Sequence, residues 1–436
     1  MECPPNGFMK IFILSVFLLV PANAALIFPK EAIPTKTGYL PINSNSSSSI
    51  YFAFYEAQKP VLPLPQTPLL VWLQGGPGCS SMIGNFFELG PWRVANSNSL
   101  PVLKPNPGAW NHMFGLVFLD NPIGTGFSIA ATTEEIPRDQ ETVAKHLFIA
   151  LKSFILLNPS FKSRPIYITG ESYAGKYVPA IGSYILQQNS RLPLSRKVNL
   201  KGVAIGNGLT DPEIQVTTHA ITGYYTGLIN AKQKKQLAEM QTKAVSLTRA
   251  GKWIDAVEAR GEVLDNLQNM TGLATLYDLR RKTPYELELV VELLENDYVK
   301  EALGVNKSVV WEACSRVVAD ALQDDVMKSV RFMVEDILKK KTRVLLYQGQ
   351  FDLQDGVVSN EAWIKKMKWN GLERFLNADR KVWEVKGEVA GYVQTWGALS
   401  EVVVSGAGHP VPADQAVNSQ ALIQDWVLQR GLFEEN

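Results

Sequence analysis

The chain has 436 residues, 46% of them hydrophobic, so it is long enough to bury the core of one large domain or of two smaller ones. Its 43 lysines and arginines nearly balance its 42 aspartates and glutamates. This balance excludes the broad positive field that draws a protein onto nucleic acid or an acidic membrane surface.

The N-terminus has the pattern of a secretory signal peptide. Lys10 precedes an apolar run from Ile11 to Val20, and small residues that a signal peptidase accepts end at Ala24. An uncleaved membrane anchor is the alternative, but about ten apolar residues are too few to cross a hydrocarbon core of roughly 30 Å. We therefore expect residues 1–24 to be removed and residues 25–436 to enter the secretory pathway without a stable membrane anchor, bound for the vacuole or the extracellular space.

Disulfides and glycosylation are compatible with this route. Of the three cysteines, Cys3 lies in the predicted signal peptide, which leaves Cys79 and Cys314 either as a disulfide or as two buried thiols. The glycosylation sequons begin at Asn45, Asn269 and Asn306.

Short apolar runs rich in β-branched and aromatic residues predict strands along the chain. They are Ile50–Tyr55, Leu69–Leu73, Leu116–Leu119, Ile166–Thr169, Val198–Ile205, Val344–Tyr347 and Val402–Val404. Between them, helices are predicted at Glu141–Leu157, Gly175–Gln187, Val326–Lys340 and Gln415–Leu428. This alternation is typical of an α/β fold, in which helices cover both faces of a mostly parallel sheet.

The alternation stops between about residues 211 and 320, where helix formers are frequent and strand signals are few. Lys232–Thr248 and Tyr285–Leu303 are the clearest helical stretches in this part of the chain. We expect this segment to be a helical insertion that caps the sheet.

A nucleophile elbow is predicted where the strand before Gly170 meets the helix after Gly175. The tip carries Ser172 between small residues, and a sharp strand-to-helix turn of this kind exposes a serine hydroxyl above the sheet. Ala174 stands where the general pattern has glycine. The alternative is a serine that only caps the helix.

The base and its partner are predicted from two other strand ends. His409 follows the strand Val402–Val404 through a flexible turn, and Asp352 lies just past the strand Val344–Tyr347. Ser172, Asp352 and His409 thus occur in the chain order of α/β-hydrolase triads. The other three histidines lack such a setting, and we expect them to be structural: His112, His146 and His219.

Several longer motifs resemble those of the serine carboxypeptidase family, and most of all its plant serine carboxypeptidase-like branch. The motifs are Trp72–Ser81, Glu88–Pro91, Asp120–Ser128, Gly170–Pro179, Gly206–Gly208 and Ala407–Gln415, within a match that spans about residues 36–430. The resemblance implies an α/β-hydrolase fold and a serine hydrolase that removes residues from the carboxyl end of peptides. It also implies that Cys79 and Cys314 form a long-range disulfide.

The resemblance also assigns roles within the site. Ser172 would be the nucleophile, His409 the general base and Asp352 the residue that orients it. The amides of Gly76 and Tyr173 would form the oxyanion hole. The terminal carboxylate of the substrate would be bound by Gln74, the Gly75 amide, Glu88 and Glu171.

Two acidic side chains can bind an anion if they share a proton, because neighbouring carboxyls raise each other's pKa. We therefore expect peptides to bind more tightly at acidic than at neutral pH. The chain departs from the family at three positions that touch binding: Gln74 replaces the usual Asn, Asp355 a common Cys, and Pro410 a frequent Met.

Two alternatives remain at this stage. An acyltransferase of the same fold would use the same serine to move an acyl group from a sugar ester to an alcohol. Such relatives tend to carry Asp where this chain has Glu171, which favours the peptidase. A secreted binding protein that has lost turnover is the other alternative. Neither metal-ligand motifs nor a phosphate-binding loop occur, so no cofactor is expected.

Overall fold

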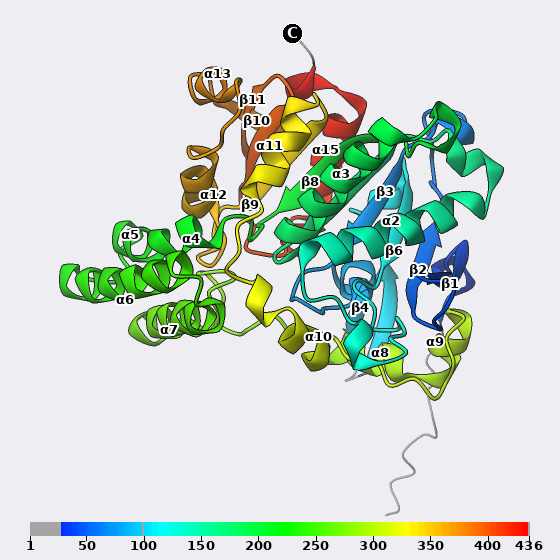
Figure 1. The fold of residues 1–436 in the computed structure, drawn as a ribbon, viewed down its shortest axis with the longest axis horizontal. Helices are drawn as coiled ribbons and strands as arrows, with labels where there is room; N and C mark the ends of the chain where they lie inside the picture. Colours follow the sequence, from blue (N-terminus) through cyan, green and yellow to red (C-terminus); the bar gives the residue numbers. More distant parts are fainter. Residues whose placement is uncertain (1–27, 98–99, 435–436) are drawn as a thin grey trace, which may run out of the picture.

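The computed structural model describes residues 28–97 and 100–434, so the predicted signal peptide lies outside the described residues. In this part of the chain, a 10-stranded sheet has the order β1-β2-β6-β3-β7-β8-β9-β12-β11-β10 (Figure 1). From edge to edge the strands are β1 (Lys36–Pro41), β2 (Ser49–Tyr55), β6 (Gly115–Leu119), β3 (Leu69–Leu73), β7 (Ile166–Glu171), β8 (Leu200–Gly206), β9 (Arg343–Gly349), β12 (Leu399–Val404), β11 (Glu388–Trp396) and β10 (Lys381–Val385).

The strands from β6 to β12 run parallel, whereas the two strands at each edge pair antiparallel. The predicted α/β architecture with a mostly parallel sheet is therefore confirmed. A separate antiparallel pair is formed by β4 (Trp92–Ser97) and β5 (Leu100–Pro105).

Both faces of the sheet are buried, which explains why the central strands are apolar throughout. Along β3, Leu69, Val71 and Leu73 belong to one hydrophobic core, while Leu70 and Trp72 belong to the other. Alternate side chains of a strand point to opposite faces, so each core must be covered by its own helices.

The first core is covered by α2 (Gln140–Leu156), α3 (Ala174–Arg191) and α11 (Arg331–Lys339), which lie in front of the sheet in Figure 1. The second core is covered mainly by α15 (Ala416–Leu428) on the opposite face. Asp139 begins α2 by accepting a hydrogen bond from the Thr142 amide. The shorter helices of the sheet domain are α1 (Ser81–Ile83), α12 (Val357–Ile364), α13 (Leu372–Leu376) and α14 (Val411–Asp414).

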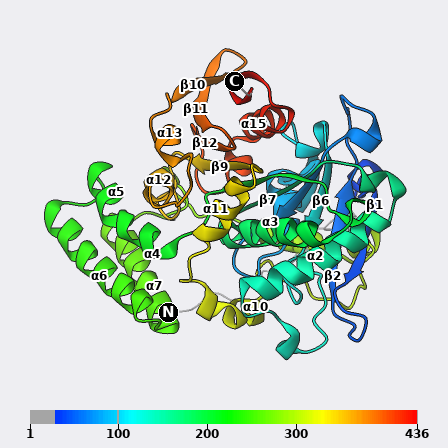
Figure 2. The same cartoon turned by 45° about the horizontal axis from the view of Figure 1, so that its top comes forward.

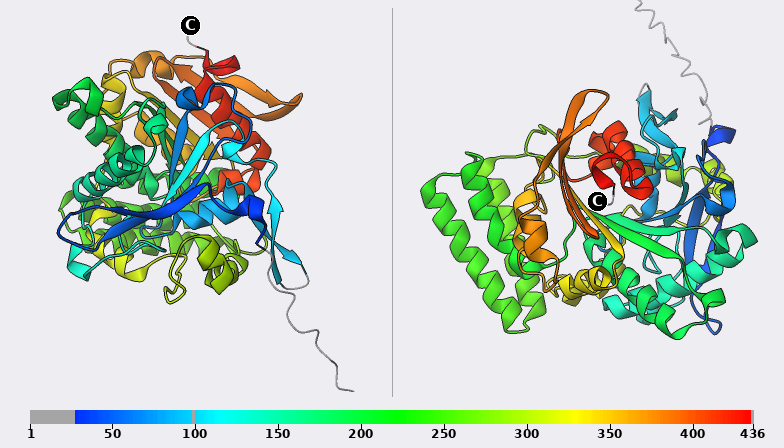
Figure 3. Two further views of the ribbon diagram at one scale, coloured as in Figure 1. Left: turned by 90° about the vertical axis from the view of Figure 1, so that its right-hand side faces the viewer. Right: turned by 90° about the horizontal axis from the view of Figure 1, so that it is seen from above.

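The segment between about residues 211 and 320 is helical. Its part up to Thr271 projects to one side of the sheet (Figures 2 and 3), whereas its later helices lie against the sheet domain. Its helices are α4 (Pro212–Gln215), α5 (His219–Tyr225), α6 (Ala231–Arg249), α7 (Trp253–Thr271), α8 (Glu288–Glu295), α9 (Asp297–Ala302) and α10 (Arg316–Ala321). An antiparallel hairpin of α6 and α7 encloses its own small core, which includes Leu237 and Val263. We refer to this segment as the cap.

Two predicted helices differ in the structure. The stretch Tyr285–Leu303 is divided because Asn296 caps a new helix, accepting hydrogen bonds from the amides of Tyr298 and Val299. The predicted helix Val326–Lys340 begins only at Arg331, since the carbonyl groups just before it bind a buried lysine instead.

Candidate active site

Ser172 lies at the tip of a tight turn between β7 and α3 and is only partly buried. Its φ angle is 61°, in the left-handed region that non-glycine residues rarely adopt. The turn is held by hydrogen bonds from the Ser172 amide to the Gly206 carbonyl, 3.0 Å, and from the Gly175 amide to the Ser172 carbonyl, 2.8 Å. Strain held in place by surrounding contacts is common at functional sites.

The glycines around the elbow allow segments to approach it closely. A Cβ on Gly170 would lie 2.4 Å from the Leu73 carbonyl oxygen, and one on Gly175 would lie 2.6 Å from the Leu209 amide. A Cβ on Gly75 would lie 2.7 Å from both the Ser172 Cβ and the Tyr173 nitrogen. The loop after β3 is therefore in direct contact with the serine.

Asp352 and His409 meet beyond the ends of the neighbouring parallel strands β9 and β12, in the same sheet in which β7 leads into the elbow. The His409 Nδ1 and the Asp352 Oδ2 are 2.7 Å apart, and both side chains are buried. The His409 Nε2 is also buried and makes no hydrogen bond within the described residues. This nitrogen is the one that must face a serine hydroxyl if the imidazole is to act as a base.

Asn207 also orients Asp352, and sequence reasoning assigned it no role. Its Nδ2 donates to the Asp352 Oδ2 over 2.7 Å, and its Oδ1 accepts from the Gly349 amide over 3.0 Å. Asn207 directly follows β8, so it connects the ends of β8 and β9. The motif Gly206–Gly208 was noticed in the sequence, but no spacing rule shows which loop its amide would reach.

Tyr277 is a second residue that was missed. Its ring stacks on the His409 ring with centroids 4.3 Å apart and 10° between the planes. The His409 amide also donates to the Tyr277 carbonyl over 2.7 Å. Because Tyr277 comes from the cap, more than 100 residues away in the chain, its position depends on tertiary packing.

The electrostatics of the site act on the imidazole in opposite directions. Burial, the largest single effect, lowers the pKa of His409, but the charge and hydrogen bond of Asp352 and the charges of other nearby acids together outweigh it, and the net shift is upward. Asp355 and Glu88 add to the upward shift. The charged form that arises when a base accepts a proton is thus stabilised here.

The amides proposed for the oxyanion hole lie on the two segments that touch at the elbow. Tyr173 follows the serine directly, and Gly76 has a φ angle of 110° that suits glycine. Within the described residues, neither amide donates a hydrogen bond to another backbone group. Two such donors near a reacting carbonyl can stabilise the negative charge on its oxygen.

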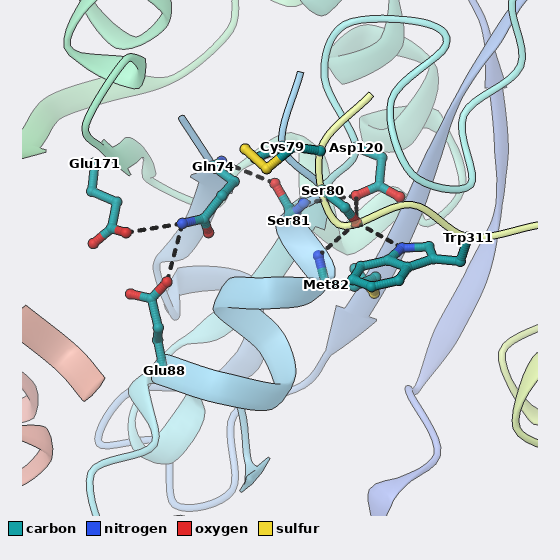
Figure 4. Close-up of a disulfide and its surroundings, with 10 residues drawn as sticks. Gln74, Cys79, Ser80, Ser81, Met82, Glu88, Asp120, Glu171 and Trp311 are labelled. Atoms are coloured by element: carbon teal, nitrogen blue, oxygen red, sulfur yellow. Dashed lines mark hydrogen bonds between the residues drawn. A yellow bond between two sulfur atoms is a disulfide. The ribbon is translucent and has the colours of Figure 1, made fainter. Parts of the chain in front are cut away.

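Gln74, Glu88 and Glu171 form a buried cluster, which we call the anchor (Figure 4). The Gln74 Nε2 donates to the Glu88 Oε1 over 3.1 Å and to the Glu171 Oε1 over 2.9 Å. The Gln74 Oε1 accepts from the Trp72 indole over 2.9 Å, which fixes the orientation of the amide. The three side chains predicted to bind a carboxylate are thus brought together, and one of them, Glu171, directly precedes Ser172 in the chain.

Both acids of the anchor have raised pKa values. Burial raises the pKa of Glu88 to about 7, against the effect of hydrogen bonds from its neighbours. Burial raises the pKa of Glu171 well above its usual range, and the nearby charge of Glu88 raises it further. At mildly acidic pH the pair therefore holds protons and can donate hydrogen bonds to an anion.

Cys79 and Cys314 form a disulfide, which joins the loop after β3 to the end of the cap (Figure 4). Backbone hydrogen bonds reinforce this connection, from Ser80 to Ala313 and from Ser315 to Gly78, each 2.8 Å. The pairing implied by the resemblance is present.

Asp120 organises the same loop from the end of β6 (Figure 4). Its Oδ1 accepts hydrogen bonds from the Ser80 hydroxyl, 2.7 Å, and the Ser81 amide, 2.8 Å. The Ser80 oxygen also accepts from the Trp311 indole of the cap over 3.1 Å. Gly126 must lack a side chain, because a Cβ there would lie 2.4 Å from the Asp120 Oδ2.

Asp355 is buried beside the triad rather than exposed in a pocket wall. Its amide donates to the Asp352 Oδ1 over 3.3 Å, and its own Oδ1 accepts from Gln215 over 3.3 Å. Arg260 of α7 lies 3.7 Å from the same oxygen. The buried Asp355 carboxylate is thus compensated by a cation from the cap.

Among residues 28–97 and 100–434, no group of His, Cys, Asp and Glu could hold a metal ion. In the same part of the chain, no helix is long and apolar enough to cross a membrane. His219 is buried and its Nδ1 lies 3.2 Å from the Leu353 carbonyl oxygen.

Comparison with known proteins identifies relatives of this chain among the serine carboxypeptidases. The family model described as serine carboxypeptidase matches residues 28–429. Serine carboxypeptidase-like 50 of Arabidopsis thaliana is 57% identical over 434 residues, which cover 99% of this chain and 96% of that protein. Venom serine carboxypeptidase of Apis mellifera is 36% identical over 423 residues, covering 94% and 88% of the two chains.

Among solved structures, the prohormone-processing carboxypeptidase Kex1 of Saccharomyces cerevisiae superposes with a TM-score of 0.82. It is 25% identical, and the match covers 94% of each chain. The architecture is therefore the α/β-hydrolase fold that the motifs predicted.

Proposed function

Because the chain belongs to the serine carboxypeptidase family, we propose that it is a serine-type carboxypeptidase that releases residues from the carboxyl ends of peptides. Ser172 is the nucleophile, His409 the general base and Asp352 the residue that orients the imidazole. No cofactor takes part in this chemistry.

The reaction proceeds through an acyl-enzyme. The Ser172 oxygen attacks the carbonyl carbon of the last peptide bond while His409 takes the hydroxyl proton. The oxygen that becomes negative accepts hydrogen bonds from the amides of Gly76 and Tyr173. The carbon–nitrogen bond then breaks as His409 protonates the departing amine, and water releases the remaining peptide from Ser172 by the same steps.

The observation that carries this proposal is the position of the anchor. Glu171 directly precedes Ser172, and Gln74 bridges it to Glu88 within hydrogen-bond distance. A terminal carboxylate bound there lies one residue beyond the bond that Ser172 attacks. An enzyme that cuts inside chains has no use for a carboxylate site so close to its nucleophile.

The anchor also sets the pH range. Binding of the terminal carboxylate needs protons on Glu88 and Glu171, which are lost above a pKa of about 7 for Glu88. Turnover needs an unprotonated His409, whose pKa is raised. We expect cleavage on the acidic side of neutrality, with kcat falling at lower pH as His409 becomes protonated.

An acidic compartment of the secretory route, the vacuole or the extracellular space, fits these features. The disulfide requires oxidising conditions, and the asparagines of the three sequons are exposed on the surface: Asn45, Asn269 and Asn306.

The experiment is a comparison of two substrates at pH 5 and at pH 6.5, because the raised pKa of His409 lowers turnover at the more acidic pH. Purified protein is incubated with a blocked dipeptide that has a free carboxylate and, separately, with a glucose ester plus an acceptor alcohol. The proposal predicts release of the terminal amino acid and no acyl transfer, with Ser172→Ala inactive. Acyl transfer without peptide cleavage would replace the proposal with the acyltransferase alternative, and neither reaction would indicate a binding protein.

A further inference from the structure

A buried carboxylate behind the elbow receives three hydrogen-bond donors from two different helices and the elbow itself. The Asp325 Oδ2 lies 2.7 Å from the Tyr173 hydroxyl, 2.7 Å from the Gln140 Nε2 and 2.9 Å from the Lys176 Nζ. All four side chains are buried. We call this set the hub.

The hub also fixes the segment that returns from the cap. The Lys176 ammonium donates to the carbonyl groups of Asp325, Val326 and Lys328, the last over 2.7 Å. These carbonyls lie where the sequence predicted the start of a helix, so the lysine takes the place of helical hydrogen bonds. Burial lowers the pKa of Lys176 to about 8 although Asp325 opposes the shift, so the ammonium is charged at acidic and neutral pH.

A buried ion pair of this kind adds little net stability, because the attraction between the charges is offset by the loss of their hydration. The pair instead fixes the positions of the groups that it joins. They stay together because separating them or removing either one leaves an unpaired charge inside the protein. Tyr173 is held further by its ring, which contacts the Tyr177 ring at 5.1 Å between centroids and lies 5.6 Å from the Lys176 Nζ. Tyr173, the residue after the nucleophile, is thus held in place by the contacts of its side chain.

We propose that Asp325 and the Tyr173 hydroxyl are positioning groups that hold the Tyr173 amide in the oxyanion hole. This inference rests on the proposed function, because it assumes that the amide accepts the developing negative charge. The amide belongs to the backbone, but its position follows from a side chain that is anchored to Asp325, in the segment between α10 and α11. Small displacements of such a donor weaken transition-state stabilisation more than substrate binding.

Tyr173→Phe tests the inference, because it removes one hydroxyl and leaves the backbone amide in place. We expect kcat for a blocked dipeptide to fall by about tenfold, less than the loss when an oxyanion donor is deleted, with KM changed by less than about twofold. Phenylethylboronic acid forms a tetrahedral adduct with an active serine, and its affinity should fall by the same factor as kcat. The stoichiometry of fluorophosphonate labelling measures the fraction of active sites, so that a loss of folded protein is not mistaken for a lower kcat.

Tyr184→Phe is the matched control, since it removes a hydroxyl from the same helix α3 at a partly buried position far along it. It should leave kcat, KM and boronic acid affinity unchanged. If Tyr173→Phe does not fold, Gln140→Leu perturbs the hub from α2 without altering the elbow, and it should lower kcat and boronic acid affinity together. Unchanged kcat and boronic acid affinity in a folded, fully labelled variant would overturn the inference.

Failure of the proposed function would look different. Wild-type protein that cleaves no blocked dipeptide contradicts the peptidase assignment, whereas boronic acid affinity still reports on the hub because the adduct needs only the serine and the oxyanion hole. Equal boronic acid affinities of wild type and Tyr173→Phe would then contradict the positioning role alone.

Discussion

At the scale of single residues, Gln74 shows how one added methylene changes a binding site. The sequence alone indicated only a longer side chain at a position where relatives carry Asn. In the structure, the longer amide reaches both acids of the anchor, while its oxygen is held by Trp72. Both amide protons are therefore already used, so we expect a substrate carboxylate to receive its hydrogen bonds from Glu88, Glu171 and the Gly75 amide.

This arrangement makes peptide binding depend on pH. The pKa of Glu88 is raised to about 7, so the protonated donor is present below that pH and is lost above it. We expect KM for a dipeptide with a free carboxylate to be nearly constant below pH 6 and to rise by about tenfold per pH unit above pH 7. Steady-state kinetics between pH 5 and 8.5 measure this directly.

Glu88→Gln provides a permanent donor in place of a titrating one, and it should flatten the rise in KM. The same peptide with an amidated terminus is the substrate control, because it carries no carboxylate for the anchor to bind. A free-carboxylate KM that does not change from pH 5 to 8.5 in the wild type would show that the anchor works without a proton.

At the scale of elements, the sequence predicted most of the sheet and the elbow but not the edges. Continuous apolar runs such as Leu69–Leu73 are recognisable because both faces of the strand are buried. The edge strands β1 and β10 show no regular alternation of buried and exposed side chains and carry exposed polar residues. Their pairing therefore depends on the neighbouring strands rather than on their own sequence pattern.

The site shows the same division. Ser172, Asp352 and His409 follow predicted strands, and parallel strands bring their carboxyl ends to one edge of the sheet. Asn207 and Tyr277 were not predicted, because their partners depend on how loops and the cap fold back. The hub was missed for the same reason, since Asp325 ends a short 3-10 helix just before the predicted helix Val326–Lys340, and its partners come from α2, α3 and the elbow.

The disulfide is the element-scale link between the cap and the loop that carries Gly76. Cys79 and Cys314 are 235 residues apart in the chain, so the crosslink restricts the unfolded state strongly. Replacing both Cys79 and Cys314 with Ser should lower the free energy of unfolding by about 5 kcal/mol at most on the chain-entropy estimate. Denaturant unfolding of the double variant and of the wild type measures the difference, and equal midpoints would show that backbone bonds alone hold the loop.

At the scale of the whole molecule, several buried carboxyls contribute stability at acidic pH that is lost as the pH rises. Burial raises the pKa of Glu88 and of Glu401 to about 7 and that of Asp120 to about 6. Each of these groups binds a proton more tightly in the folded than in the unfolded chain. The free energy of unfolding therefore falls as the pH rises from the unfolded pKa, near 4.5 for Glu401, to the folded one.

Glu401 allows this effect to be isolated, because it lies on β12 away from the site and accepts a hydrogen bond from Asn360 that a glutamine can also accept. Its shift corresponds to a loss on the order of 3 kcal/mol between pH 4.5 and 7. Glu401→Gln should reduce the pH dependence of stability by this amount. Every other titrating group is common to both proteins, so parallel curves of unfolding free energy against pH would contradict the assignment.

The central claim is that Ser172, His409 and Asp352 act as one relay, and the rate of covalent labelling tests it most directly. A fluorophosphonate reacts with a serine only when a neighbouring base activates it. We predict rapid labelling of wild-type protein at Ser172, identified by peptide mass spectrometry, no labelling of Ser172→Ala, and labelling slowed by about 10³-fold or more in His409→Gln and Asp352→Asn. Labelling of His409→Gln at the wild-type rate, or no labelling of folded wild-type protein, would contradict the account.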